Sequence, residues 1–337
     1  MNTHELPMIL FTVIAQMCVG AFITLGIITV VGRAKYDKVT VERVTEPALF
    51  AIGPALVAGL AVSMLHMNDV MHTLNVLRHW DSSWLSREII FGCAFAGAGF
   101  LFAVSQWYKL FSYQIRQVLA VIAAFFGICL VYSMSQIYYS LKAVPAWHTW
   151  IVPFHFAGTT ILLGALAVGT AIMATISYRF REAPGSGHPV RKETEEDRPS
   201  GGGLLTKLRR APAPAAEDRD AQWEMATRTL QAIAVVTALT GTAILISYIL
   251  HISDLAGGDP VAQASAGVFA GGFFFVRLAL LAIAAILLAL FTFRTASKQL
   301  DSPAPLTWII SIAFALAFVA ELMGRSLHYD SMMRIGI

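Results

Sequence analysis

Two ionisable side chains, His66 and Glu88, lie twenty-two residues apart at the ends of a stretch rich in polar and aromatic residues. An imidazole titrates near neutral pH, and a carboxyl group that is partly removed from water does so as well. Both groups can therefore take up and release protons under physiological conditions, which is what a general acid or base does. We expect His66 and Glu88 to carry the chemistry of this chain.

Several other polar residues are candidates to contact a ligand bound beside this pair. They are Arg78, Trp84, Ser86 and Arg87 from the same stretch, and Arg325 from a second polar group near the C-terminus, Gly324-Arg325 with His328-Tyr329. Arg87 can hold Glu88 ionised or polarise a ligand carbonyl, although adjacent helical residues point about 100° apart. A place at a membrane–water boundary is the simpler interpretation of Trp84, and a solvent or headgroup contact is that of Arg78.

The composition places these residues in a membrane protein. Of the 337 residues, 57% are hydrophobic and 13% are charged, with a net charge of +3. Soluble chains carry roughly 25% charged residues, so this chain has too little charge to cover a water-facing surface. A soluble enzyme, a disordered protein and a nucleic-acid-binding protein are therefore excluded. Elements that span a bilayer must position the polar residues.

Eight apolar segments are long enough to cross a bilayer, which takes about 20 apolar residues in a helix. They are Met8–Val31, Pro47–Leu65, Leu85–Trp107, Ile115–Leu141, Trp150–Tyr178, Leu230–His251, Val268–Phe293 and Leu306–Met323. The segments are continuously apolar and do not alternate, so helices and not barrel strands are expected. We predict an all-α integral membrane protein with eight transmembrane helices, the first of which is retained and is not a cleaved signal peptide.

The distribution of Lys and Arg predicts the orientation. Counted in and beside the loops, 18 of the 24 basic residues follow the first, third, fifth and seventh segments, and 5 lie on the other side. The positive-inside rule places the richer side in the cytoplasm and both termini on the outer, periplasmic side. The bias persists without the longest loop, at 8 against 5.

The chain accordingly divides into three parts. Residues 1–178 hold helices one to five with an outer loop at 66–88, residues 179–228 form a long cytoplasmic loop, and residues 229–337 hold helices six to eight. Glycine, proline and mixed charges dominate the long loop, which we interpret as a flexible tether. Binding of anionic lipid by Lys207–Arg210 is the alternative.

This arrangement brings His66 and Glu88 to similar depth. His66 falls at the outer end of helix two, and Glu88 falls one turn into helix three, behind a cap supplied by Asp81, Ser82 or Ser83. A quinol loses two protons together with two electrons at the membrane edge, so it requires a proton acceptor at each ring oxygen. An ionisable residue within a span is in any case a candidate functional residue. A quinone-binding site is therefore the leading hypothesis.

The sequence encodes no evident metal centre. The three cysteines lie singly within apolar segments, without a Cys-x-x-Cys pair. The placement of the nine histidines excludes two stacked haems and leaves open one axial pair, such as His66 with His155. We expect no haem and no iron–sulfur cluster in this chain, and a b-haem cytochrome remains an alternative.

Two charged residues lie within the later spans. Arg277 in the seventh segment and Glu321 in the eighth are expected to form a buried ion pair. A solute transporter would need broken helices in matching positions, and only Pro54, with its neighbouring glycines, offers such a break.

The motifs around this candidate site resemble those of the membrane-anchor subunits of dimethyl sulfoxide reductase-type enzymes. The resemblance rests on His66, on the sequence Ser-Trp-Leu-Ser-Arg-Glu that ends at Glu88, and on Gly324-Arg325-x-x-His328-Tyr329. Eight spans with both termini outside also match, so the resemblance covers nearly the whole chain. One departure is that Met-Asn-Asp-Val follows His66, where the family has Leu-Gly-x-Pro.

The resemblance implies a subunit in a bacterial inner membrane that binds menaquinol or ubiquinol near the outer face. Such a subunit exchanges electrons with an iron–sulfur subunit, which serves a molybdopterin catalytic subunit, and it carries no haem. The residues that match His66 and Glu88 are associated with quinol binding and oxidation in that family. The same anchor role in a quinone-reducing enzyme, such as one that oxidises sulfite, is the alternative, because the same groups handle protons in either direction.

Overall fold

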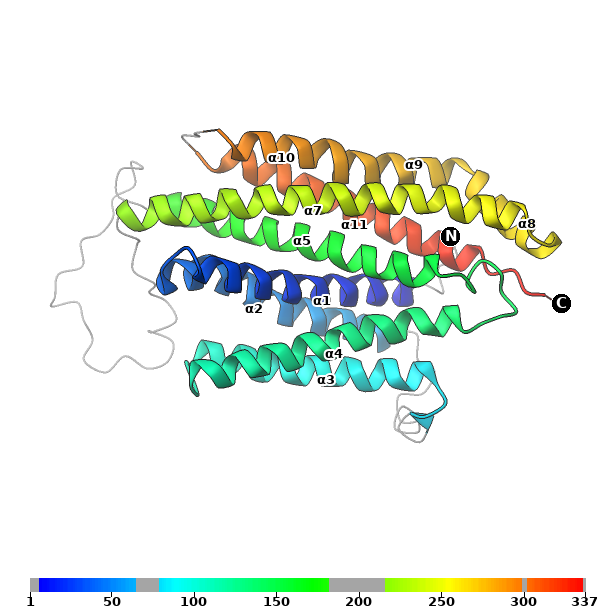
Figure 1. Ribbon diagram of the computed structural model, residues 1–337, viewed down its shortest axis with the longest axis horizontal. Coiled ribbons are helices and arrows are strands. Elements are labelled where there is room, and N and C mark those ends of the chain that lie inside the picture. Colours follow the sequence, from blue (N-terminus) through cyan, green and yellow to red (C-terminus); the bar gives the residue numbers. More distant parts are fainter. Residues whose placement is uncertain (1–5, 65–78, 182–215, 299–301, 336–337) are drawn as a thin grey trace.

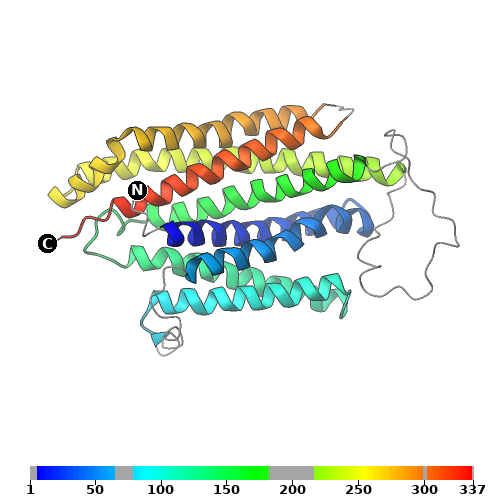
Figure 2. The ribbon, with the colours of Figure 1, turned by 180° about the vertical axis from the view of Figure 1, so that it is seen from behind.

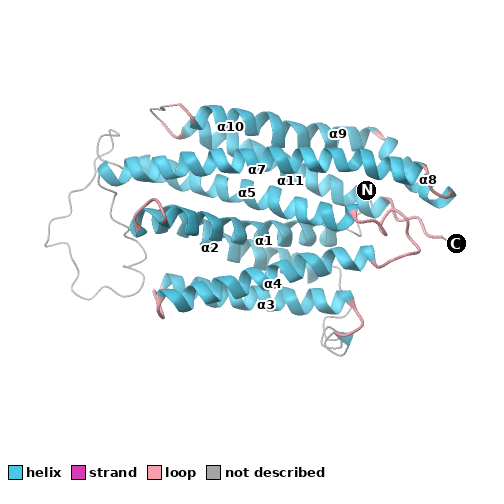
Figure 3. Ribbon diagram, viewed as in Figure 1, coloured by secondary structure: helices cyan, strands magenta, loops and turns pink. Residues whose placement is uncertain are grey.

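A computed structural model describes residues 6–64, 79–181, 216–298 and 302–335, and the regular elements in these ranges are helices (Figure 3). They are α1 (Leu6–Arg33), α2 (Lys38–Met64), α3 (Trp84–Trp107), α4 (Tyr113–Tyr139), α5 (Ile151–Arg181), α7 (Ala216–Ala256), α8 (Pro260–Gly267), the 3₁₀ turn η4 (Val268–Ala270), α9 (Gly272–Ala282), the π-helical η5 (Ile283–Leu287), α10 (Leu288–Ala296) and α11 (Ala304–Asp330). The predicted all-α class is confirmed for this part of the chain.

The long helices run side by side along one axis (Figure 1). The start of α1 and the end of α11 lie at the same end of the bundle, which we call the outer end after the predicted orientation (Figures 1 and 2). The opposite end, at which α1 ends and α2 begins, is called the inner end. The placement of both termini outside the cell stays a prediction.

Seven stretches of the described residues are long and apolar enough to cross a membrane. They are Leu6–Arg33, Trp84–Trp107, Tyr113–Tyr139, Ile151–Phe180, Arg219–Ala256, Gly272–Ala296 and Ala304–Asp330. The helix α2 is not among them, although it packs along α1. The chain is therefore a multi-pass membrane protein with seven candidate spans, and the eighth span stays a prediction.

The helices α1 and α5 form the centre of the bundle, and their backbones come into contact at glycine residues. A Cβ atom at Gly20 would lie 1.8 Å from the carbonyl oxygen of Thr160, and one at Gly164 would lie 2.2 Å from the carbonyl carbon of Gly20. Small residues at such crossings let helix backbones meet in a membrane, where no hydrophobic force drives them together. These glycines therefore set the contact around which the other helices pack.

Several helix boundaries differ from the predicted ones. The helix α2 begins at Lys38, well before the predicted Pro47, because the Asp37 carboxylate accepts hydrogen bonds from the backbone N–H groups of Val39 (2.9 Å) and Thr40 (3.1 Å). Hydrogen bonding from the side chain and the backbone of Thr40 lowers the pKa of Asp37. The helix continues through both of its prolines, Pro47 and Pro54.

The predicted loop 179–228 extends at both ends over residues that are helical in the structure. The helix α5 continues to Arg181, and α7 begins at Ala216, so the loop prediction is wrong for these flanks. Gln222, Met225 and Ala226 recur every three or four residues and are buried, which gives this polar segment an inward helical face. The middle of the loop, 182–215, with the candidate lipid-binding patch, lies outside the described residues.

The helix α11 likewise continues to Asp330, beyond the predicted end at Met323. Gly324 does not end the helix, because the following Arg325, Leu327 and Tyr329 are buried against other helices. The whole Gly324–Tyr329 motif therefore lies on one helix, at the outer end.

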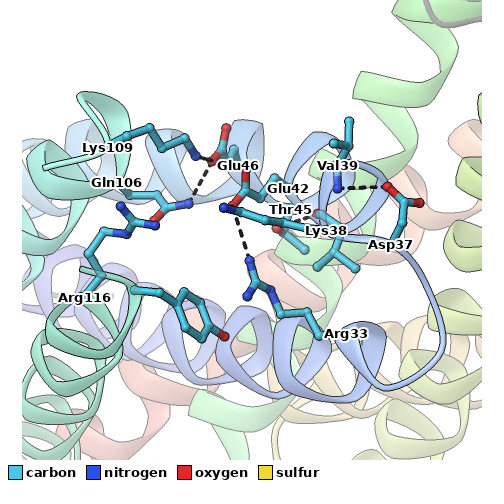
Figure 4. A network of polar contacts seen from close by, with 12 residues as sticks. Arg33, Asp37, Lys38, Val39, Glu42, Thr45, Glu46, Gln106, Lys109 and Arg116 are labelled. Carbon is cyan, nitrogen blue, oxygen red and sulfur yellow. Dashed lines mark hydrogen bonds and ion pairs between the residues drawn. The ribbon is translucent and has the colours of Figure 1, made fainter. Parts of the chain in front are cut away.

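A network of charged residues fixes the inner end of the bundle (Figure 4). Glu42 of α2 pairs with Arg33 of α1 at 3.3 Å and with Lys109 at 3.1 Å. Lys109 also lies 2.5 Å from Glu46, which accepts a hydrogen bond from Gln106 at 2.8 Å. The network ties α1, α2 and α3 together far from the candidate site.

Candidate functional site

Glu88 lies one turn into α3 and is buried, with 8% of its surface exposed. The Ser83 hydroxyl caps this helix by accepting a hydrogen bond from the backbone N–H of Ser86 at 3.3 Å, as expected for one of the three candidate caps. The cap fixes the first turn, and the turn directs Glu88 into the bundle. A carboxyl group so placed in a membrane protein requires a polar partner.

Arg87 does not pair with Glu88. Its Nε atom donates to the carbonyl oxygen of Trp80 at 2.9 Å, its Nη2 atom donates to that of Asp81 at 2.5 Å, and its guanidinium lies 4.2 Å from the ring centroid of Trp84. The expected divergence of Arg87 and Glu88 on the helix is therefore found. Arg87 holds the loop before α3 against the helix, and only its second predicted role, a contact to a ligand carbonyl, stays a prediction.

Trp84 and Ser86 support the start of the same helix. The Trp84 ring meets Tyr132 of α4 edge-on, with ring centroids 5.8 Å apart. Ser86 is buried at 3% exposure. Both residues position the turn that carries Glu88, and their contact with a ligand stays a prediction.

The cation whose charge acts on Glu88 is Arg325 of α11. Arg325 is buried, donates from Nη2 to the Gln16 Oε1 atom at 2.9 Å, and places its guanidinium 3.7 Å from the ring centroid of Phe156. Residues of α1 and α5 thus contact this arginine of α11, and its charge acts on Glu88 of α3. The sequence predicts Arg325 as a residue that borders the pocket and contacts a ligand, or as a docking contact for a partner, and its contact with a ligand stays a prediction.

Aromatic residues close the outer side of this cluster. The hydroxyl groups of Tyr138 and Tyr329 lie 2.5 Å apart, and Glu88 also interacts electrostatically with Tyr138. The Trp147 indole N–H donates to the His328 carbonyl oxygen at 2.7 Å, and its ring stacks on that of His328 at 5.1 Å. These rings hold the end of α11 against α4 and the loop that follows it.

A second charged group lies beside the first. Arg277 of α9 pairs with Glu321 of α11 at 3.3 Å, which confirms the predicted pair, and Thr159 donates to the other carboxylate oxygen at 2.5 Å. Arg277 fits there because Gly324 has no side chain: a Cβ atom at that position would lie 2.9 Å from the arginine Nε. In the Gly324-Arg325 motif, the glycine therefore leaves room for Arg277, and the next residue is the second arginine, Arg325.

Sequence reasoning missed Gln16, Tyr138 and Trp147. Gln16 is a lone amide within an apolar segment, and a polar residue at that depth was the one available signal. Tyr138 and Trp147 are indistinguishable by pattern from membrane-boundary aromatics. Their role depends on a tertiary contact with α11.

Two predicted site residues, His66 and Arg78, lie outside the described residues. The end of α2 and the start of α3 both lie toward the outer end of the bundle (Figures 1 and 2). The predicted proximity of His66 to Glu88 therefore stays a prediction.

An apolar groove of about 540 Å³ opens between α2 and α3, with one wall from α1. Its lining includes Phe22, Phe50, Pro54, Phe95, Gly99 and Trp107. Phe95 lies seven residues after Glu88 on α3, or roughly 10 Å along the helix axis. The groove thus begins about two turns from the buried carboxyl group and continues along the same helix.

The fold and the site define a polytopic helical membrane protein with a buried cluster of charged and aromatic residues at one end. The model of the family described as DMSO reductase anchor subunit (DmsC) matches residues 1–183, which is more than half of the chain. The chain belongs to this family, as the motifs at Glu88 and Arg325 suggested.

Curated relatives extend the similarity beyond the family match. Over 335 residues the chain is 25% identical to the C subunit of anaerobic dimethyl sulfoxide reductase from Escherichia coli, and the alignment covers 99% of this chain and 97% of the relative. It is 28% identical over 176 residues to the corresponding subunit of Haemophilus influenzae, covering 51% of this chain and 61% of that one. The E. coli alignment includes the C-terminal helices that supply Arg277, Glu321 and Arg325.

Proposed function

We propose that this anchor subunit binds quinol at its outer end and oxidises it at Glu88. The burial of Glu88 beside Arg325, in a chain of the anchor family, carries the proposal. The electrons pass to an iron–sulfur partner subunit, which supplies a molybdopterin catalytic subunit in a bacterial inner membrane. Menaquinol and ubiquinol share the chemistry that the site requires.

The proposed reaction removes two protons and two electrons from the quinol and leaves the quinone. Glu88 accepts one proton and His66 the other, while both electrons leave to the iron–sulfur partner. Arg325 stabilises the Glu88 carboxylate before the transfer, because opposite charges attract more strongly in a medium of low polarity than in water. Gln16 and Phe156 hold the guanidinium in place.

The apolar groove between α2 and α3 suits the isoprenoid tail of the quinol. It is lined almost wholly by apolar side chains and faces the part of the bundle that lies in the membrane. It begins about two helical turns from Glu88, so one ligand of several isoprene units can reach from the carboxyl group into the groove.

We also propose that the chain holds no haem of its own. His155, which lies one turn into a candidate span, has its Nε2 atom 2.6 Å from the Ser247 hydroxyl. An absorption spectrum of the purified complex without a haem Soret band is the expected result, and a band that requires this subunit would contradict the proposal.

Quinol-dependent turnover of the complete complex tests the main proposal. Glu88→Gln keeps the size of the side chain and removes the acceptor, so we expect turnover with quinol to fall roughly 10²–10⁴-fold, the usual contribution of a general base. His66→Ala is expected to act in the same direction. Turnover driven by a reduced viologen dye, which supplies electrons to the catalytic subunit directly, should not change.

Glu224→Gln is the matched control, because Glu224 is an exposed carboxylate of α7 that pairs with Arg228 near the inner end. It should leave both activities unchanged. Normal quinol turnover in both Glu88→Gln and His66→Ala would overturn the proposed function.

A further inference from the structure

A small polar cavity lies beside the Glu88 cluster, between α5, α7, α9 and α11. Its volume is about 30 Å³, and its lining includes Thr159, Tyr248, His251, Arg277, Arg325 and His328. The proposed quinol chemistry uses Arg325 alone among these. A cavity lined by two arginines and three histidines, the third being His155, within a membrane bundle needs a physical explanation.

Four side-chain nitrogen atoms that belong to residues of this lining are buried and have no hydrogen-bond partner among the described residues. They are Nδ1 of His251, Nη1 of Arg277, Nε of Arg325 and Nε2 of His328. Leaving one buried polar group unpaired costs about 1–3 kcal/mol, and more for a charged group. Four such groups around one cavity indicate that it is filled by something that hydrogen-bonds.

The size and chemistry of the cavity identify the occupant as water. A water needs roughly 10–15 Å³ of this kind of volume and two to four polar partners, so the cavity has room for about two. A quinone ring is too large for it. The guanidinium atoms can only donate, so the occupant must accept hydrogen bonds, which water does.

The positions of His328 and His251 define a direction for proton transfer through this water. His328 belongs to the Glu88 cluster, because its ring meets Tyr138 edge-on at 4.7 Å and Tyr138 interacts electrostatically with Glu88. His251 lies near the outer end of α7 and is itself buried. An imidazole can take up a proton on one nitrogen and release one from the other, so it can pass protons along a chain of hydrogen bonds.

We propose that the cavity holds ordered water that links His328 to His251 and carries protons from the Glu88 site toward the outer end. The proposal rests on the proposed quinol oxidation for the source of the protons, but the presence of water does not depend on it. The Arg277–Glu321 pair forms one wall of the cavity and orients the water through Nη1. His328 and His251 are the relay residues, and no electron passes along this route.

Radical footprinting of the intact complex in H₂¹⁸O tests the water directly. X-ray pulses convert bound water into hydroxyl radicals, which oxidise side chains beside it. We expect ¹⁸O at Tyr248 and at His251 or His328, although these side chains are largely buried. Met173 is the internal control, because its thioether is very reactive and its side chain is fully buried away from this cavity. Lining residues that remain unlabelled would overturn the proposal.

Substitution tests the relay. His251→Leu should lower quinol-dependent turnover about tenfold or more and leave dye-driven turnover unchanged. His148→Leu is the matched control, because His148 is an exposed histidine that stacks on Tyr139 at the same end and does not line the cavity. Equal quinol turnover in His251→Leu and wild type would refute the relay.

The two proposals fail in different ways. Labelled cavity residues together with full activity of Glu88→Gln would leave the water in place and remove the quinol site. Unlabelled residues together with an inactive Glu88→Gln would do the reverse. If His251→Leu fails to assemble, the footprint of the unaltered protein still decides whether the cavity holds water.

Discussion

Arg325 joins several parts of the candidate site. Its guanidinium bonds to Gln16, lies on the ring of Phe156 and acts electrostatically on Glu88. A planar guanidinium can make these contacts simultaneously, whereas a lysine ammonium is a single compact charge. The site therefore depends on the shape of this side chain as well as on its charge.

A double-mutant cycle between Glu88 and Arg325 measures this dependence. Arg325→Gln should destabilise the subunit by about 1–3 kcal/mol, because it leaves Gln16 and Glu88 without their charged partner. With Glu88→Gln present as well, the loss should be smaller, with a coupling of about 0.5–3 kcal/mol. Denaturant titration of the detergent-solubilised complex gives the four stabilities. Strict additivity would show that the two side chains are independent.

Gly324 is predicted to be intolerant of even one methyl group. In Gly324→Ala the new Cβ would lie 2.9 Å from Nε and 3.0 Å from Nη2 of Arg277, so the guanidinium must move away from Glu321. We expect a loss of about 1–3 kcal/mol, typical of overpacking, read as a lower midpoint of thermal unfolding. Gly97→Ala on α3, where a Cβ meets nothing within 4 Å, is the control and should be neutral or slightly stabilising.

At the scale of the helices, the crossing of α1 and α5 is the most constrained contact. Gly20→Ala would bring a Cβ atom to 1.8 Å from a backbone carbonyl, which no side-chain movement can relieve. We expect a loss of more than about 3 kcal/mol and little assembled complex, measured by native gel of solubilised membranes. Gly26→Ala, on the same helix and facing open space, should assemble normally. Normal assembly of Gly20→Ala would show that the helices do not cross as described.

Hydrophobic runs were sufficient to predict that the apolar segments are helical. The start of α3 and its serine cap were predicted nearly to the residue, because the cap is a local signal. The extensions of α7 to Ala216 and of α11 to Asp330 were not, because those turns are polar in sequence. They are helical because Met225, Leu327 and Tyr329 find buried positions on neighbouring helices.

The residues of the candidate site likewise divide into those that a local motif predicted and those whose role depends on tertiary packing. Glu88 and Arg325 stand in short motifs, so sequence alone singled them out. The partners of Glu88 could not be read from proximity along the chain: Arg87 is adjacent to Glu88 but turns to the loop, while Arg325 comes from the far end of the sequence. Gln16 and Tyr138 were missed because only the packing of α1 and α4 against α11 gives them a role.

At the scale of the whole molecule, the two ends of the bundle have different characters. The inner end is held by exposed or half-exposed ion pairs such as Lys109–Glu42, which contribute about 0–1 kcal/mol each. The outer end buries its charges among aromatic rings. Charges are retained in an apolar setting when they serve chemistry or hold a specific arrangement, so the asymmetry supports a functional outer end and a structural inner end.

The groove between α2 and α3 begins about two helical turns from Glu88, and two glycines of α3 allow a matched test of its proposed role. A Cβ at Gly99 or at Gly97 meets nothing within 4 Å, but only Gly99 lines the groove. Gly99→Phe should fill the groove and raise KM about tenfold for a quinol with a long isoprenoid tail. Its KM for a quinol with a short alkyl tail should stay near that of wild type.

Gly97→Phe places the same ring on the same helix outside the groove, so it should leave both KM values unchanged. Comparison of the two tails within one variant removes any general effect of the substitution on assembly, because such an effect would lower turnover with both quinols. Equal KM changes for long and short tails in Gly99→Phe would show that the tail lies elsewhere. A selective change would place the tail along α3, and the quinol ring would then lie about two turns further on, beside Glu88.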